Sequence, residues 1–157
     1  MKHKEKPLAE ITLRKYEKPY KLEGRELIKK LCLSLGLLQP GDGRDVIVDV
    51  FCAVYLSESP QTAQNVENFV KKHRNEHKLN SLGITPANIR RQIKRLRDSH
   101  ILQKTGQTYH LNENLTLPEL FSDKIERFYL PSLLERIKEY CHEAEKWKNG
   151  TMPKMQQ

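Results

Sequence analysis

The sequence predicts a mainly α-helical protein with one small β-hairpin and with helices on both the N- and C-terminal sides of that hairpin. Two observations lead to this fold class. Hydrophobic residues recur at helical spacing in several segments, and a short alternating segment with a glycine turn follows the most basic of them. No apolar run approaches the roughly 20 residues that a membrane-spanning helix needs. The 157 residues, 37% of them hydrophobic, suffice for one modest core.

The charge is positive overall and unevenly distributed. The formal net charge is +8, and the sequence pI is about 9.4. Residues 61–111 contain ten basic and three acidic side chains, whereas residues 113–148 contain six basic and eight acidic ones. A positive field concentrated on one stretch suggests a polyanionic partner, and nucleic acid is the commonest.

The cysteines indicate a reducing compartment. Cys32, Cys52 and Cys141 lie far apart, are odd in number and form no CxxC pair. Buried thiols fit this pattern better than disulfides or a zinc site. Because the charged N-terminus has no apolar segment behind it, we expect no secretory signal, no membrane association and a cytoplasmic location.

The N-terminal part is expected to contain a basic flexible tail over residues 1–7 and a strand and helix extension over residues 8–43. Weak alternation predicts a short edge strand from Glu10 to Tyr16. A helix is predicted from Gly24 to Gly36, with an apolar face made of Leu27, Ile28, Leu31 and Leu35. A Pro-Gly turn cluster follows at residues 39–43.

Two further helices are predicted before the basic segment. Residues 44–57 carry a wide apolar stripe, which is typical of a helix that lines the hydrophobic core. The stripe consists of Val46, Ile47, Val50, Phe51, Val54 and Tyr55. Ser59 followed by Pro60 resembles a helix N-cap, and the helix that it begins is expected to run to about His77. Its inward residues are expected to be Val66, Phe69 and Val70.

The segment from Leu82 to Leu111 is the most informative. Thr85 and Pro86 predict a helix start, and Ile89, Ile93 and Leu96 give the helix from Pro86 to Asp98 one buried face. Five of its thirteen residues are basic and one is acidic. Residues 101–104 and 108–111 then predict a hairpin joined by a three-residue loop, Thr105-Gly106-Gln107.

This order of elements resembles the winged helix-turn-helix superfamily of prokaryotic and archaeal transcriptional regulators. The resemblance covers roughly residues 44–111 and rests on the Leu82-Gly83-Ile84-Thr85 turn, the apolar spacing of the basic helix, and the Ile101-Leu102 and Tyr109-His110-Leu111 strands. The helix over residues 61–77 and its connection are longer than usual. His100 occupies a place where many members have glycine.

The resemblance implies double-stranded DNA as the partner, with helix 86–98 in the major groove and the hairpin of residues 101–111 on the backbone. Asn88 would pair with adenine, Arg91 with guanine, and Gln92 and Arg95 with bases or backbone. The residues expected to reach phosphates or the minor groove are Arg90, Lys94 and Arg97 on the helix and Lys104, Thr105 and Gln107 on the hairpin.

A solvated basic face is the alternative for this helix. The low acidic content, and the absence of Glu–Lys pairs four residues apart, favour nucleic-acid binding instead. The predicted function is therefore sequence-specific DNA binding, as a dimeric transcriptional regulator. Two alternatives stay open: a winged-helix module that binds an unknown protein partner in a larger complex, and an RNA-binding or replication accessory protein.

No constellation predicts catalysis or a cofactor, so we expect a protein that is not an enzyme and that binds no metal. His73 and His77, four residues apart, lack further ligands at recognisable spacing. Cys141 and His142 are adjacent on a helix and therefore point in different directions. The Gly41-Asp42-Gly43 segment lacks the context of a phosphate-binding loop.

The C-terminal region, residues 112–148, is expected to be helical and to mediate dimerisation, with a flexible tail over 149–157. Pro118 predicts a helix start, and Pro131 predicts a break or a new first turn. Beyond Pro131 an apolar stripe alternates spacings of three and four and consists of Leu130, Leu133, Ile137, Tyr140, Ala144 and Trp147. The stripe either packs against Leu27, Leu31 and Leu35 of the same chain or pairs with a second copy. We favour a homodimer, because two-fold symmetry would place two recognition helices on successive groove turns.

Overall fold

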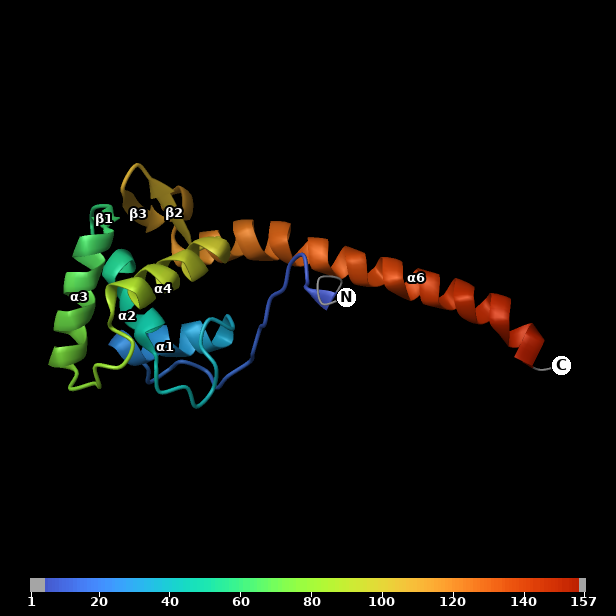
Figure 1. Ribbon diagram of the computed structural model, residues 1–157, viewed down its shortest axis with the longest axis horizontal. Helices are drawn as coiled ribbons and strands as arrows, with labels where there is room; N and C mark the ends of the chain where they lie inside the picture. Colours follow the sequence, from blue (N-terminus) through green and yellow to red (C-terminus); the bar gives the residue numbers. More distant parts are fainter. Residues whose placement is uncertain (1–4, 156–157) are drawn as a thin grey trace. The chain divides into compact units, whose positions relative to one another are not determined.

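The computed structural model describes residues 5–155, and describes side chains as far as residue 151. The chain is mainly helical, with one small antiparallel sheet (Figure 1). Its elements are α1 (Gly24–Ser34), α2 (Val46–Tyr55), β1 (Gln61–Thr62), α3 (Ala63–Glu76), α4 (Pro86–Asp98), β2 (Leu102–Thr105), β3 (Thr108–Leu111), a 3-10 turn η2 (Asn112–Asn114), α5 (Leu117–Leu120), a π-helix η3 (Phe121–Tyr129) and α6 (Leu130–Met155).

The chain divides into two compact units. Residues 11–120 form one unit, and the described parts of residues 1–10 and 121–157 group as the other. The first unit therefore joins most of the segment expected as an extension, residues 8–43, with residues 44–111. Lys2 and Lys4 of the expected basic tail lie outside the described residues, and α6 includes residues 149–155, which were expected to be a flexible tail.

Helix α2 forms the centre of the larger unit. It contacts α1, α3 and α4, and its residues from Val46 to Val54 are all buried. Eight of these nine residues are apolar, so burying them supplies much of the hydrophobic stabilisation of the unit. The three surrounding helices each contribute a narrower apolar face, as the sequence pattern predicts for amphipathic helices.

The sheet has the strand order β1-β3-β2 and is antiparallel throughout. Strand β1 pairs Gln61 with Tyr109 and Thr62 with Thr108. The expected N-cap at Ser59 is wrong, because the residues after Pro60 extend to pair with β3. The helix begins three residues later than expected, at Ala63, where the Thr62 hydroxyl accepts a hydrogen bond from the backbone N–H of Asn65 at 3.1 Å.

The hairpin loop is shorter than expected. Thr105 belongs to β2 and pairs with Thr108, so the loop consists of Gly106 and Gln107 alone. Gly106 has a φ of +61°, the positive value that tight hairpin loops require. The alternating pattern located the strands correctly, but it did not distinguish a two-residue loop from a three-residue one.

The expected edge strand over residues 10–16 is also wrong. Residues 10–16 have no regular secondary structure. The Arg14 backbone N–H donates to the carbonyl of Ser34 at 2.9 Å, and its guanidinium donates to the carbonyls of Leu33 and Leu38 at 2.9 and 3.2 Å. The segment thus satisfies carbonyls at the C-terminal end of α1 and in the loop that follows it, instead of joining the sheet.

Candidate nucleic-acid interface

Helix α4 has the bounds that the sequence predicts, Pro86–Asp98. Thr85 caps it, since its side-chain oxygen accepts a hydrogen bond from the backbone N–H of Asn88 at 3.2 Å. Ile89, Ile93 and Leu96 are buried in the core. The side chains that point the other way are polar or basic, so the helix presents a positively charged face to solvent.

Part of that face is tied to the protein itself. The Asn88 amide donates to the carbonyl of Gly83 at 2.6 Å and accepts from Gln92 at 3.1 Å. Arg95 then donates to Gln92 at 2.8 Å and to the carbonyl of Leu37 at 2.7 Å. These three expected base-contacting side chains form one continuous chain of hydrogen bonds. These bonds fix the orientation of the Asn88 amide, so a bidentate pair with adenine would have to fit that orientation or compete with them.

Three arginines on α4 have no such restraint. The side chains of Arg90, Arg91 and Arg97 are exposed, and none of them forms a hydrogen bond or an ion pair with another of the residues that the structure describes. Lys94 does have a partner, because its ammonium lies 2.7 Å from the carboxylate of Asp98, four residues later. Acid–base pairing at helical spacing is therefore present on this helix, although an exposed pair of this kind contributes little to stability.

The hairpin carries exposed polar side chains beside α4. Lys104, Thr105 and Gln107, which were expected to contact a groove or the backbone of DNA, are all exposed. The Lys104 ammonium lies 5.7 Å from the centroid of the Tyr109 ring, and the Thr105 hydroxyl lies 2.9 Å from Nε2 of His110. The exposed side chains of the hairpin therefore include one lysine and several uncharged polar groups.

Two open grooves flank the exposed face of α4. The groove between α4 and the hairpin has a volume of about 580 Å³, and its basic lining residues are Arg90, Lys94, Arg97 and Lys104. The groove between α4 and the loop over residues 37–44 has a volume of about 470 Å³ and is lined by Arg44, Arg91 and Arg95, among others. Sequence reasoning missed this loop, because no pattern predicts that the carbonyl of Leu37 reaches Arg95.

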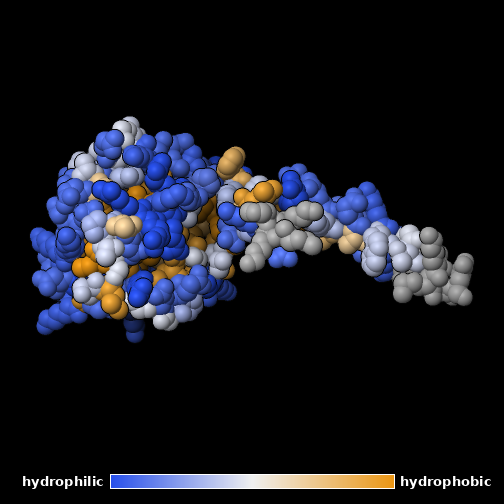
Figure 2. Space-filling model, in the orientation of Figure 1, coloured by the Kyte–Doolittle hydropathy of each residue, from blue (hydrophilic) through white to orange (hydrophobic). Residues whose placement is uncertain are grey.

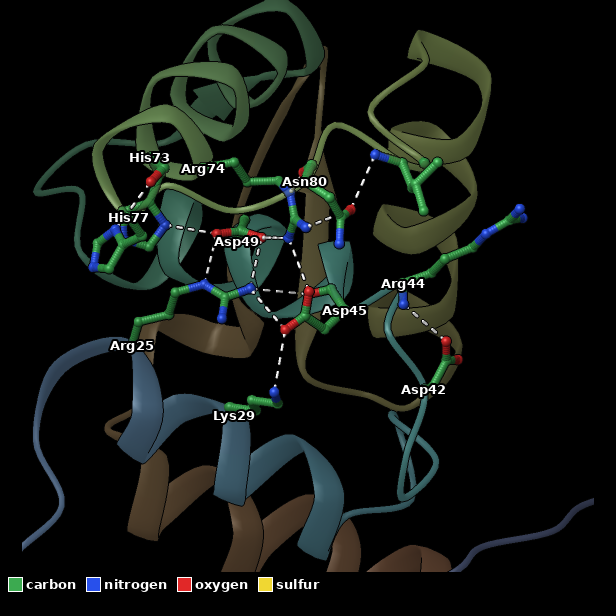
Figure 3. Close-up of polar contacts among 12 residues, drawn as sticks. Arg25, Lys29, Asp42, Arg44, Asp45, Asp49, His73, Arg74, His77 and Asn80 are labelled. Atoms are coloured by element: carbon green, nitrogen blue, oxygen red, sulfur yellow. Dashed lines mark hydrogen bonds and ion pairs between the residues drawn. The ribbon is translucent and has the colours of Figure 1, made fainter.

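A buried network of charges that the sequence pattern did not predict joins α1, α2 and α3 (Figure 3). Asp49 on α2 is fully buried and binds Arg25 through two hydrogen bonds of 3.0 Å each. Arg74 on α3 donates to Asp49 at 2.8 Å and to Asp45 at 2.9 Å. The available signal was the pair of aspartates four residues apart on the otherwise apolar helix.

The network keeps both carboxylates ionised. Burial acts to raise the pKa of Asp49, but hydrogen bonds and charges from Arg25 and Arg74 outweigh burial and lower it. The pKa of Asp45 is lowered for the same reasons. The network reaches the turn before α4, since Arg74 also donates to the backbone carbonyl of Asn80 at 2.8 Å. It thereby holds α1, α2, α3 and this turn together.

His73 and His77, the two candidate metal ligands, lie beside this network. Nδ1 of His73 lies 2.8 Å from the Asp49 carboxylate, and Nδ1 of His77 lies 2.9 Å from the backbone carbonyl of His73. Within the described part of the chain, no three His, Cys, Asp or Glu side chains are placed to hold a metal ion together.

Among the residues that the structure describes, no helix is both long enough and apolar enough to cross a membrane.

The apolar stripe of α6 is largely uncovered. Leu130 and Leu133 are half-buried, whereas Ile137, Tyr140, Ala144 and Trp147 are exposed. Figure 2 shows hydrophobic side chains among hydrophilic ones along the helical segment of the smaller unit.

Comparison of the chain with protein-family models, with curated proteins and with solved structures gives no match.

Proposed function

We propose that this chain is a winged helix-turn-helix protein that binds double-stranded DNA and acts as a dimeric transcriptional regulator. The order α2-β1-α3-α4-β2-β3, together with the sheet order β1-β3-β2, supports this assignment. In such an arrangement α3 and α4 are the two helices of the helix-turn-helix, and the β2–β3 hairpin is the wing.

The observation that carries the proposal is the set of unrestrained arginines on α4. Arg90, Arg91 and Arg97 are exposed, and they have no partner among the described residues that would have to be displaced. Guanidinium groups pair with phosphate oxygens and with the O6 and N7 acceptors of guanine in a bidentate manner. A duplex that lies on this face would release counterions for each phosphate that these side chains neutralise.

The hydrogen-bond chain of Asn88, Gln92 and Arg95 refines the roles that the sequence suggested. Because these three side chains hold α4 to Gly83 and Leu37, we assign them to positioning the helix. Direct base contact then falls to Arg91, with Arg90, Lys94 and Arg97 on phosphates and Lys104, Thr105 and Gln107 on the neighbouring backbone. The exposed stripe of α6 mediates the homodimer.

The test is a titration of labelled random-sequence duplex DNA at several salt concentrations. The variant R90A/R91A removes two exposed cations without touching the hydrogen-bond chain. We expect weaker binding and a slope of log affinity against log salt that is shallower by about 1–2. The matched control K138A/K148A removes the same charge from exposed positions of α6 and should bind DNA as the parent protein does.

If both variants lose the same DNA affinity, the loss reflects net charge alone, and this outcome would contradict the proposal. A preference for RNA of the same sequence over duplex DNA would also contradict it and favour an RNA-binding protein. If duplex binding is confirmed, selection from a random pool should yield a palindromic site, as expected for a two-fold dimer.

A further inference from the structure

We infer that α6 pairs with α6 of a second copy of this chain in antiparallel orientation, about a two-fold axis between residues 138 and 139. The inference rests on the dimer of the proposed function and specifies its partner surface, orientation and register. DNA binding by α4 is not needed for it.

The exposed stripe on α6 is large for a surface that meets only water. Ile137, Tyr140 and Trp147 have exposed fractions of 58%, 74% and 70%. With Leu130, Leu133 and Ala144 they repeat at spacings of three and four, the pattern of a helix that pairs with another helix along one seam. A seam shared by two identical helices is self-complementary when a two-fold axis relates them.

The sizes of the side chains decide the orientation. In the antiparallel register that uses the whole stripe, Trp147 faces Leu130 of the second copy, Ala144 faces Leu133, and Tyr140 faces Ile137. Each large residue then meets a smaller one. A parallel pair in register would instead set Trp147 against Trp147 next to a layer of two alanines, which leaves one layer overfilled and its neighbour underfilled.

The flanking positions agree with the same register. Arg136 lies opposite Glu143 of the second copy, so two opposite-charge pairs form across the dimer. Leu134, which is 48% exposed, lies opposite Cys141 of the second copy. A parallel pair also has one complementary combination, Glu143 with Lys148. The layers of the seam therefore decide between the two orientations, and the charges support the antiparallel one.

Cysteine cross-linking in a C141S background tests the register. L133C and A144C proteins, one of them carrying a longer tag, are mixed in equal amounts, allowed to exchange and oxidised mildly. Antiparallel pairing predicts a disulfide dimer of mixed length, because residue 133 faces residue 144 of the other copy. A covalent A144C homodimer would demonstrate parallel pairing and overturn the inference. This outcome is read from the A144C protein alone and so does not depend on substituting the half-buried Leu133.

Charge reversal provides a second measurement, by sedimentation of the full chain. R136E should weaken the dimer roughly fivefold, since two attractive pairs become repulsive, and R136E/E143R should restore it. The matched reversal K138E, outside the seam, should leave the dimer unchanged. A monomer in the parent protein would overturn the inference. The R90A/R91A variant is expected to remain a dimer whatever its affinity for DNA. A failure of the DNA-binding proposal can therefore be distinguished from a failure of the dimer.

Discussion

Gly36 shows how closely the backbone is packed at a single residue. It has a φ of +71°, and a Cβ built there would lie 2.6 Å from Cβ and 2.7 Å from the carbonyl oxygen of Thr12. Gly41 has a comparable φ of +81° but has no atom within 4 Å of its added Cβ. The two glycines therefore separate the cost of the backbone conformation from the cost of the contact.

We expect G41A to lower the free energy of unfolding by about 1–2 kcal/mol, the usual cost of a left-handed residue other than glycine. G36A should lower it by about 1–3 kcal/mol more, because the Thr12 backbone must move to admit the new methyl group. Urea denaturation of the two variants measures the difference. Equal losses would show that residue 12 is not packed against residue 36.

Asp49 should make stability depend on pH. Its folded-state pKa is lowered, so its contribution is fully present above the unfolded value of about 4 and is lost as pH falls through the folded-state value. We expect D49N to cost about 3–5 kcal/mol at pH 7 and to flatten the acid side of the stability curve.

Chemical denaturation at pH values from 7 down to 3 provides the measurement for Asp49. D98N is the matched control, because Asp98 is exposed and pairs only with Lys94 among the described residues, so it should cost about 0.5 kcal/mol or less. If D49N does not fold, the acid dependence of the parent protein still tests the role of the carboxylates. A parent curve that stays level below pH 4 would contradict it.

At the scale of elements, the N-cap of α4 links stability to the proposed interface. T85A removes the oxygen that accepts from Asn88 and should lower the free energy of unfolding by about 1 kcal/mol, whereas T85S keeps the acceptor and should cost much less. Thermal unfolding followed by circular dichroism compares the two. An equal loss in both would mean that the methyl group, and not the hydroxyl, matters at this position.

The elements that the sequence predicted well are those with a strong local signal. Helix α4 has a cap, a proline at its first position and regular apolar spacing, and its bounds were predicted correctly. Strand β1 was missed because two residues have no periodicity, and its pairing with β3 depends on tertiary contact. The Arg25–Asp49 and Arg95–Leu37 contacts were missed because they join residues 24 and 58 positions apart.

His100 follows helix α4 in a backbone conformation that its residue type does not predict. Its φ is +65°, the conformation that glycine favours, and it follows the last turn of α4. The backbone N–H groups of His100 and Ile101 donate to the carbonyls of Arg97 and Leu96, at 3.0 Å each, which closes the helix end. Glycine is the residue most often found in this conformation, and here a histidine adopts it.

At the scale of the whole molecule, the two compact units predict separable properties. A fragment of residues 11–120 is the larger unit and lacks η3 and α6. We expect it to unfold cooperatively, to sediment as a monomer and to bind duplex DNA more weakly than the full chain. An unfolded fragment, or a dimeric one, would contradict this division of roles.

The three thiols differ enough to give the native chain a built-in reporter. Burial raises the pKa of Cys32 to about 12 and that of Cys52 to about 11, so neither forms much thiolate at neutral pH. Cys141 is exposed on α6. A maleimide dye should therefore label one position per chain without any mutation, and because Cys141 flanks the proposed seam, the rate of labelling should fall when two chains assemble.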